Sequence, residues 1–331
     1  MVQIGINGFG RIGRLAFRAA IKKEGVEVVA INDLESLEYL AYALKYDSVH
    51  GRFDGSVTID NGNLIVNGRT IRVSAKKHPE NISWDHVNVD VVIEATGLFT
   101  KLKQASRHMK GGAKKVVISA PSEDAPMFIM GLNHQKIKED DLVFSNASCT
   151  ANCLAPIVKI LDDNFEIEEG LVSTIHAATR SQNTVDGFEA KRRRGRAAIN
   201  NIIPTSTLAT DALTVIMPNL KGKLKAMAFR VPTVDVSLID LSVRLKKSTS
   251  YEQIKAKMKN ASEAEFKGLL GYTEDLVVSQ DFVSDTRISV FDASAGIELN
   301  PNFFKIVAWY DNEFGYANKI VDLLHYASSV R

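Results

Sequence analysis

The chain has 331 residues, which is long enough for two domains that each bury a core. Hydrophobic residues make up 45% and charged residues 24%, and the formal net charge of +2 gives no global reason to expect a nucleic acid or an anionic membrane as the main partner. No stretch approaches the ~20 apolar residues that a membrane span needs. The first strand begins at Val2, leaving no room for a signal peptide, so a cytoplasmic protein is expected.

The chain begins with a predicted strand, a glycine-rich turn and a helix. Residues 2–6 are apolar, and Gly8, Gly10 and Gly13 follow them in the spacing G-x-G-x-x-G, with a helical pattern from there on. The first glycine allows a tight turn, the second lets the backbone approach a pyrophosphate, and the third lets the helix pack close to the strand. The pattern therefore predicts a dinucleotide-binding fold with the phosphates at a helix N-terminus.

A second strand, residues 26–31, ends just before Asp33, which lies 20 residues after Gly13. A carboxylate at this distance is expected to bind the ribose hydroxyls of NAD and to repel the 2′-phosphate of NADP. The alternative is that Asp33 only caps the end of the strand.

Three further apolar runs alternate with helical stretches and predict a mostly parallel, doubly wound (Rossmann) sheet of the α/β class. These runs are residues 89–95, 115–119 and 142–145. Thr96 and Ser119 lie at the carboxyl ends of their strands, the edge at which such sheets bind ligands.

The second half predicts an α+β catalytic domain with a largely antiparallel sheet, because its strands are longer and alternate more. The expected strands are residues 171–177, 225–231, 234–245, 288–291 and 305–310, and a helix over 314–329 ends the chain. Within 234–245 the apolar phase slips, which predicts a β-bulge or a strand covered on both faces by a neighbouring subunit. We expect an NAD-binding domain over 1–148, a catalytic domain over 149–312, and a C-terminal helix over 313–331 that packs back on the NAD-binding domain.

The only two cysteines are Cys149 and Cys153, and Cys149 lies between a predicted strand and a helix expected over 153–161. The unpaired N–H groups and the positive end of a helix favour a thiolate at such a turn. A buried structural role is the alternative, and it suits Cys153 better. His176 closes a strand 27 residues after Cys149 and can act as the base.

Five runs along the whole chain resemble the phosphorylating glyceraldehyde-3-phosphate dehydrogenases of glycolysis. They are residues 5–14, 45–53, 145–153, 228–233 and 309–313. The resemblance implies that Cys149 attacks the aldehyde carbon, that hydride passes to the nicotinamide, and that phosphate cleaves the resulting thioester to an acyl phosphate. His176 would pair with the thiolate and take the hydroxyl proton, and the backbone N–H of Cys149 would help to hold the oxyanion.

The resemblance also implies the binding residues. Those for the phosphate groups of glyceraldehyde 3-phosphate and of inorganic phosphate would be Ser148, Thr150, Thr179, Ser181, Arg196, Thr207, Leu208 and Arg230. Those for NAD would be Gly8, Gly10, Arg11, Ile12, Gly13, Asp33, Lys77, Ser119 and Asn312. No metal is expected, and the family is a homotetramer.

Two positions and one loop depart from the family pattern. Ala151 stands where a second threonine is common, and Leu208 stands where glycine is usual, so a side chain and a narrower range of φ and ψ are expected to crowd or strain the inorganic-phosphate site. The basic loop, residues 188–196, is one residue short against many relatives. One interpretation is a solvated loop. The other is a basic patch that screens the NAD pyrophosphate of a neighbouring subunit or that binds polyanions.

These departures leave alternatives open. One is a dehydrogenase of a related sugar phosphate such as erythrose 4-phosphate, or one that uses NADP. Another is a thiol redox sensor or an RNA-binding protein that uses Cys149 and the basic loop.

Overall fold

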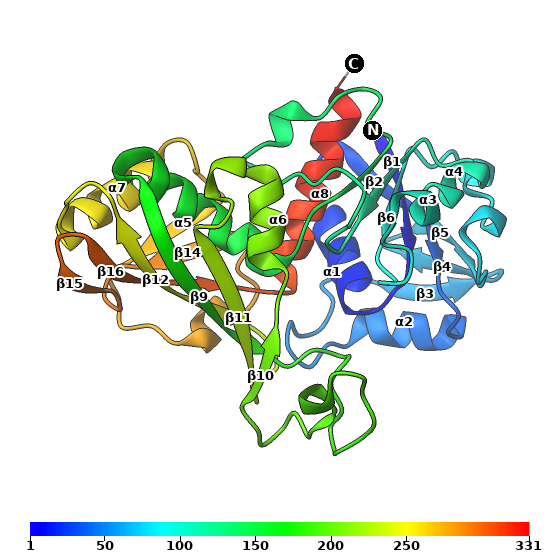
Figure 1. Ribbon diagram of the computed structural model, residues 1–331. Coiled ribbons are helices and arrows are strands. Elements are labelled where there is room, and N and C mark those ends of the chain that lie inside the picture. The colour runs from blue at the N-terminus through cyan, green and yellow to red at the C-terminus, as the bar shows by residue number, and fades with distance from the viewer. Residues whose placement is uncertain (331) are drawn as a thin grey trace. The chain divides into compact units, whose positions relative to one another are not determined.

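The computed structural model describes residues 1–330 and divides the chain into two compact units. The first unit contains Met1–Ala147 and the chain from Ala317 onward, and the second contains Ser148–Tyr316 (Figure 1). These limits differ by a few residues from the expected 1–148, 149–312 and 313–331, and the assignment of roles to those segments stays a prediction. No helix within residues 1–330 is long and apolar enough to cross a membrane.

The first unit is built on an eight-stranded sheet with the order β3-β4-β5-β2-β1-β6-β7-β8. Its strands are β1 (Val2–Asn7), β2 (Val26–Asn32), β3 (Val57–Asp60), β4 (Asn63–Val66), β5 (Arg69–Ser74), β6 (Val91–Glu94), β7 (Lys115–Ile118) and β8 (Val143–Ser145). From β5 to β8 all neighbours are parallel, which confirms the predicted doubly wound sheet. Its helices are α1 (Arg11–Ala20), α2 (Leu37–Lys45), α3 (Leu102–Ala105), α4 (Arg107–Lys110) and the part of α8 (Phe314–Ser329) from Ala317 onward.

The strands β3, β4 and β5, which pair with one another in antiparallel fashion, are absent from the sequence-based prediction. They are joined by two-residue turns, Asn61-Gly62 and Asn67-Gly68, in which every residue has a positive φ between 46° and 77°. Asn-Gly is the strongest short-range signal for such a hairpin turn, so this pair of dipeptides could have revealed the three strands.

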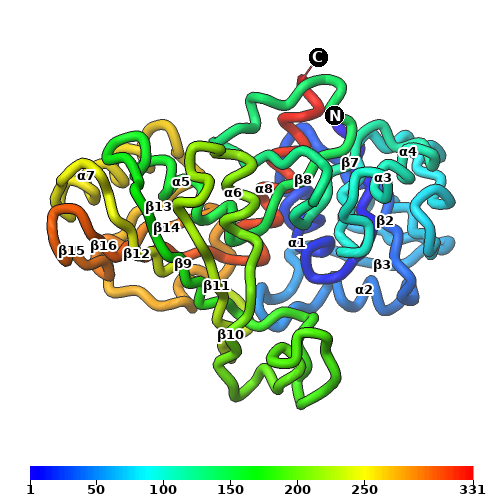
Figure 2. The backbone as a smooth tube through the Cα atoms, in the orientation of Figure 1, coloured from blue at the N-terminus to red at the C-terminus, as the bar shows by residue number. Residues whose placement is uncertain are grey.

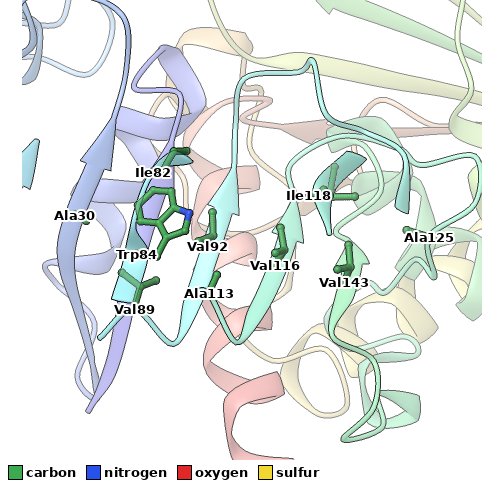
Figure 3. Packing of buried hydrophobic residues seen from close by; sticks show 11 residues of the cluster. Ala30, Ile82, Trp84, Val89, Val92, Ala113, Val116, Ile118, Ala125 and Val143 are labelled. Carbon is green, nitrogen blue, oxygen red and sulfur yellow. The ribbon is translucent and has the colours of Figure 1, made fainter. Parts of the chain in front are cut away.

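One face of the first sheet packs around Trp84, which is fully buried. Figure 3 shows Trp84 beside Ile82 and Val89, with aliphatic side chains on β6, β7 and β8 beyond it. A Cβ atom at Gly5 would lie 2.6 Å from the Trp84 ring, so the indole packs directly on the backbone of β1. This packing holds β1, whose end carries the glycine-rich turn.

The second unit contains a mixed sheet with the order β10-β11-β9-β12-β16-β14-β13, and β15 pairs with β16. The strands are β9 (Ile167–Ala177), β10 (Ile203–Ser206), β11 (Leu224–Val231), β12 (Ser237–Leu245), β13 (Leu270–Thr273), β14 (Ser289–Asp292), β15 (Ile297–Asn300) and β16 (Phe303–Tyr310). The pairs β9/β11 and β13/β14 are parallel and the others are antiparallel. The sheet is therefore largely antiparallel, as predicted from the sequence. The helices α5 (Cys149–Phe165), α6 (Ala209–Ile216) and α7 (Tyr251–Glu263) pack against this sheet.

The bulge predicted in the middle of 234–245 is wrong. The strand begins only at Ser237, and from there odd positions are buried and even positions half-buried without interruption. Val234 is exposed, and Val236 has a φ of 61°, so both precede the strand rather than share its pleat. The register irregularity of β12 lies at its far end, between Arg244 and Leu245.

Candidate active site

The glycine-rich turn leaves the backbone bare where α1 begins. Gly8 has a φ of 89°, and a Cβ atom there would lie 2.8 Å from the backbone N of Thr96. A Cβ atom at Gly13 would lie 2.0 Å from the carbonyl oxygen of Gly8, so only glycine allows this close packing. Gly10 is the N-cap of α1 and offers no side chain to it. The turn therefore fits a dinucleotide pyrophosphate.

Asp33 follows β2 and reaches back to this turn. Its Oδ2 accepts a hydrogen bond from the backbone N–H of Phe9 at 2.6 Å, and its Oδ1 accepts one from Glu35 at 3.1 Å. The carboxylate thus caps the local backbone, as the alternative interpretation required. Each oxygen has a second lone pair for a ribose hydroxyl, so the two roles are compatible.

The other NAD residues expected in the first unit lie on its loops and strand ends. Arg11 forms an ion pair of 2.6 Å with Asp47, and Ile12 is half-buried beside it on α1. The Ser119 hydroxyl donates to the carbonyl oxygen of Glu94 at 2.9 Å, and Lys77 is exposed. Asn312 belongs to the second unit.

A buried polar chain that the sequence analysis missed holds the end of β6. The Trp84 indole N–H donates to Nδ1 of His108 at 3.0 Å, and because an indole N–H can only donate, the ring proton lies on Nε2. Nε2 in turn faces Oε2 of Glu94 at 2.9 Å, and Asn7 donates to the same oxygen at 2.6 Å. Glu94 also accepts from the N–H and the hydroxyl of Thr96, which fixes the loop beside Gly8.

Cys149 is the first residue of α5, so this helix begins four residues earlier than predicted. Ser148 is the N-cap, and its hydroxyl accepts from the backbone N–H of Ala151 at 3.1 Å. The thiol therefore lies at the helix N-terminus, as expected, whereas Cys153 is fully buried. Both cysteines are free thiols.

His176 lies next to Cys149, with Nε2 at 3.6 Å from Sγ. Its Nδ1 lies 2.8 Å from the carbonyl oxygen of Ala177 and also contacts Nη1 of Arg230. These two neighbours require opposite tautomers, because a carbonyl accepts and a guanidinium donates. Arg230 also donates to the Ala177 oxygen at 3.1 Å, so this carbonyl can accept both donors. In this arrangement the ring proton lies on Nδ1 and is donated to the Ala177 oxygen. The lone pair of Nε2 then faces the thiol.

Burial dominates the protonation of this pair. It raises the pKa of the Cys149 thiol, against the lowering effects of Arg230 and of hydrogen bonds from Thr150. Burial and the charge of Arg230 lower the pKa of His176 to about 3. Both directions favour a neutral thiol and a neutral imidazole, although Cys149 is only half-buried. The thiolate expected at this helix N-terminus stays a prediction.

A buried tyrosine that the sequence analysis did not single out completes the surroundings. The Tyr310 hydroxyl lies 2.9 Å from Oγ1 of Thr150 and 2.9 Å from Oγ1 of Thr174. Its ring meets the His176 ring edge to face, with 6.1 Å between centroids. Tyr310 therefore joins α5, β9 and β16 around the thiol.

The chain is similar to known proteins along its length. Residues 2–102 match the profile described as the NAD-binding domain of glyceraldehyde 3-phosphate dehydrogenase, and residues 148–312 match the profile of its C-terminal domain. The glyceraldehyde-3-phosphate dehydrogenase of Salmonella typhimurium is 58% identical over 329 residues, 99% of each chain. The enzyme named glyceraldehyde-3-phosphate dehydrogenase A in Escherichia coli K12 gives the same figures, and that named glyceraldehyde-3-phosphate dehydrogenase 1 in Mucor circinelloides is 57% identical over 332 residues, 100% of this chain and 98% of its own.

The chain belongs to the glyceraldehyde-3-phosphate dehydrogenase family. Among the residues that the family resemblance assigns to phosphate, Thr179 and Ser181 lie together, with 3.1 Å between their hydroxyl oxygens. Arg230 lies opposite His176 in the parallel pairing of β11 with β9. Thr179 thus lies beside Ser181, and Arg230 lies beside His176.

Arg196 does not join them. Its guanidinium forms an exposed ion pair of 2.7 Å with Asp186, whereas Arg194 donates to the hydroxyl of Ser181. The positive charge of Arg194 is also close enough to lower the pKa values of His176 and Arg230. In this loop Arg194, and not Arg196, lies beside Ser181, and the phosphate role expected for Arg196 stays a prediction. Figure 2 shows this segment, between β9 and β10, as a long loop beside β10.

Leu208 is not strained. It is the N-cap of α6 with a φ of −99°, and its side chain is 60% exposed. A φ of this sign is open to any residue, so the expected backbone strain at this departure from other glyceraldehyde-3-phosphate dehydrogenases is wrong. The neighbouring Thr207 hydroxyl accepts from the backbone N–H of Ala209 at 3.3 Å.

Proposed function

We propose that this chain oxidises D-glyceraldehyde 3-phosphate to 1,3-bisphosphoglycerate with NAD and inorganic phosphate, through a thiohemiacetal and a thioester on Cys149. The observation that carries this proposal is the 3.6 Å approach of the Cys149 thiol to Nε2 of His176 at the start of α5. It occurs in a chain that is 58% identical to glyceraldehyde-3-phosphate dehydrogenases along its length.

In the first step Nε2 of His176 takes the thiol proton while the sulfur bonds to the aldehyde carbon. The histidine is placed for this, since its lone pair faces the sulfur while Nδ1 is held at the Ala177 carbonyl. The backbone N–H groups of the first turn of α5 lie beside the sulfur and can hold the oxygen as it gains charge. The proton then passes from His176 to this oxygen, which gives the thiohemiacetal.

Bound NAD supplies the hydride acceptor for the oxidation. As hydride leaves the thiohemiacetal carbon, Nε2 of His176 accepts the hydroxyl proton, and the carbon becomes a thioester. A neutral imidazole is the form that can accept this proton, and the lowered pKa of His176 keeps it in that form.

Inorganic phosphate then attacks the thioester carbon, and the acyl phosphate leaves as the sulfur regains its electron pair. Anion binding for this step would come from Arg230, Arg194 and the hydroxyls of Thr179 and Ser181. Thr150 and Thr207 would add hydroxyls near the helix starts of α5 and α6. We assign to Arg194 the role that the resemblance implied for Arg196.

We further propose a cytoplasmic homotetramer. Leu171 and Met227 project from β9 and β11 and are 69% and 41% exposed, on the sheet that α5, α6 and α7 pack against. An exposed apolar sheet surface of this kind suits a subunit interface. Two free thiols in one helix suit a reducing compartment. Light scattering of the purified protein tests the assembly, and a monomer would contradict it.

The activity is tested by the near-ultraviolet absorbance of NADH, with glyceraldehyde 3-phosphate, NAD and phosphate. Separate arms replace the aldehyde by erythrose 4-phosphate and NAD by NADP. Because a serine hydroxyl lacks thiolate character, Cys149→Ser should abolish turnover while the binding of NAD, measured by calorimetry, survives. More than a few per cent of wild-type turnover in Cys149→Ser would reject the nucleophile. Faster turnover of erythrose 4-phosphate by the wild type would reject the substrate.

A further inference from the structure

A row of polar side chains crosses the carboxyl edge of the first sheet, the edge at which such sheets bind ligands. It consists of the last residues of four neighbouring parallel strands, which are Ser74 on β5, Asn32 on β2, Asn7 on β1 and Glu94 on β6. Each is the register partner of the next. Ser74 donates to Asn32 at 2.8 Å, Asn32 to Asn7 at 2.8 Å, and Asn7 to Glu94 at 2.6 Å. The last three residues are at most 3% exposed.

The direction of the hydrogen bonds in this row is fixed from both ends. At one end the Asn32 amide bonds the backbone of Lys76 twice, because Oδ1 accepts the N–H at 2.8 Å and Nδ2 donates to the carbonyl at 2.9 Å. At the other end the Trp84 indole can only donate to Nδ1 of His108, so Nε2 of that ring can only donate to Glu94. The amides and the ring in between cannot turn without placing two donors or two acceptors face to face.

Glu94 joins this row to the loop that follows β6. Its Oε2 accepts from Asn7 and His108, and its Oε1 accepts from the Thr96 hydroxyl and, at 2.8 Å, from the backbone N–H of Thr96. The Thr96 hydroxyl accepts in turn from the backbone N–H of Leu98 at 3.1 Å. All these neighbours of Glu94 donate, which is what an acceptor-only carboxylate needs when its residue is 1% exposed.

The loop held by Glu94 packs directly against the glycine-rich turn. A Cβ atom at Gly8 would lie 2.8 Å from the backbone N of Thr96, whose N–H donates to Glu94. The N–H of Gly8 donates to the carbonyl oxygen of Asn32 at 2.8 Å. Residues tied to the row therefore contact the turn on both sides, and a shift of either would move the backbone N–H groups that suit a pyrophosphate.

We propose that Glu94 is a positioning residue for NAD, because its carboxylate holds the loop after β6 against Gly8 and so fixes the glycine-rich turn before the two phosphates bind. A site that is ordered in advance loses less binding free energy to ordering. Glu94 is 1% exposed, so it acts through Thr96. All the residues of the row belong to the first unit, and this role rests on the proposed function only through its cofactor, NAD.

Glu94→Gln tests this role in the full-length protein, because it replaces one acceptor oxygen by an N–H donor at nearly constant size. If the new amide nitrogen faces Thr96, it meets a backbone N–H, and if it faces Asn7 and His108, it meets two donors that cannot turn. Either orientation releases the loop, and the Kd for NAD, measured by calorimetry, should rise about tenfold. The Kd for ADP-ribose, which keeps both phosphates and lacks the nicotinamide, should rise by the same factor.

Val92→Ala is the matched control, since Val92 is a fully buried residue of the same strand and has no polar side-chain atom. It should lower the melting temperature and leave both Kd values unchanged. In steady-state assays Glu94→Gln should raise the KM for NAD and leave the KM for the aldehyde close to wild type. A general loss of stability does not produce that split between substrates.

Thr96→Val tests the same contact from the side of the loop. It removes the hydroxyl between Glu94 and Leu98 on a half-buried residue, so the role can be measured even where Glu94→Gln does not fold. The Kd for NAD should rise about threefold, and Thr96→Ser, which keeps the hydroxyl, should bring it back towards the wild-type value. The double variant should bind NAD no more weakly than Glu94→Gln alone, because both changes break one contact.

An unchanged Kd for NAD in folded Glu94→Gln or in Thr96→Val would overturn the role of Glu94. Equal weakening by Val92→Ala would also overturn it, because lost stability would then be the cause. So would a rise for NAD without one for ADP-ribose, which would place the effect at the nicotinamide. Failure of the wild type to form NADH from glyceraldehyde 3-phosphate would instead reject the proposed function. The two failures are separate, because the role of Glu94 is measured by binding alone.

Discussion

At His176 the imidazole is placed between the thiol that it must deprotonate and a guanidinium that opposes its protonation. Arg230 contacts Nδ1, and its charge adds to burial in lowering the pKa of the ring to about 3. The same charge lowers the pKa of Cys149 against the effect of burial. Arg230 therefore makes the thiol a stronger acid and the histidine a weaker base, so it lowers both pKa values together.

His176→Asn should lower kcat by ~10²–10⁴, because it removes the base for both proton transfers. It should also shift the alkylation of Cys149 by iodoacetamide to higher pH, since no group then takes the thiol proton. Alkylation rates measured across a pH series check this. An unchanged pH profile in the variant would show that the histidine and the thiol are not paired.

Arg194 and Arg196 of the basic loop offer a matched pair. Arg194→Gln should raise the KM for inorganic phosphate or for the aldehyde roughly tenfold, because a charge-assisted hydrogen bond near Ser181 is lost. Arg196→Gln breaks only an exposed ion pair with Asp186, and such pairs contribute little, so its kinetics should stay close to wild type. The reverse order of effects in steady-state assays would restore Arg196 to the phosphate site.

At the scale of elements, the starts of two helices shape the site. Ser148 caps α5 through its hydroxyl, whereas Leu208 begins α6 without a side-chain cap. The N–H of Ala209 donates to the Thr207 hydroxyl, and the N–H groups that follow it at the start of α6 can bind an anion.

Leu208→Gly should raise the KM for inorganic phosphate about two- to fivefold and leave that for the aldehyde nearly unchanged. Leu208 already has a relaxed φ of −99°, so glycine relieves nothing and adds backbone freedom that binding must remove. Steady-state assays with each substrate varied in turn provide both constants. A fall in the phosphate constant would show instead that the exposed leucine crowds the anion.

At the scale of the whole molecule, a cluster of buried acids makes stability depend on pH. Burial, with the charges of Asp311 and Glu313, raises the pKa of Asp235 from 3.8 to about 8. Between these two values the folded chain binds a proton that the unfolded chain has lost. The free energy of unfolding from this group therefore falls as pH rises through that window, and the stabilisation is gone above it.

Asp235→Asn removes this titration and should flatten the pH dependence of thermal unfolding. Above the folded pKa of about 8 the variant should melt roughly 2–4 °C higher than wild type, and at acid pH the difference should vanish. Melting curves over a pH series measure it. A variant that is equally destabilised at every pH would show that Asp235 is held as a charged hydrogen-bonding group.

Local patterns in the sequence were enough for the parts of the site that depend on neighbouring residues. The glycines of the first turn, Asp33 after β2 and Cys149 at a helix start follow from turn chemistry and periodicity within a few positions. The parallel sheet follows from the alternation of apolar runs with helices. The sequence analysis did not predict the short strands β3 to β5, because each is only four to six residues long and half exposed.

Only the tertiary structure decided which distant side chains meet. Arg230 reaches His176 across 54 positions through the parallel register of β9 and β11, and Ser237 reaches Asn312 across 75. Arg194 and Arg196 have the same chemistry, and only the path of their loop separates Ser181 from Asp186. The protonation of Cys149 also lay beyond the sequence, because burial is set by the whole fold while the helix N-terminus is local.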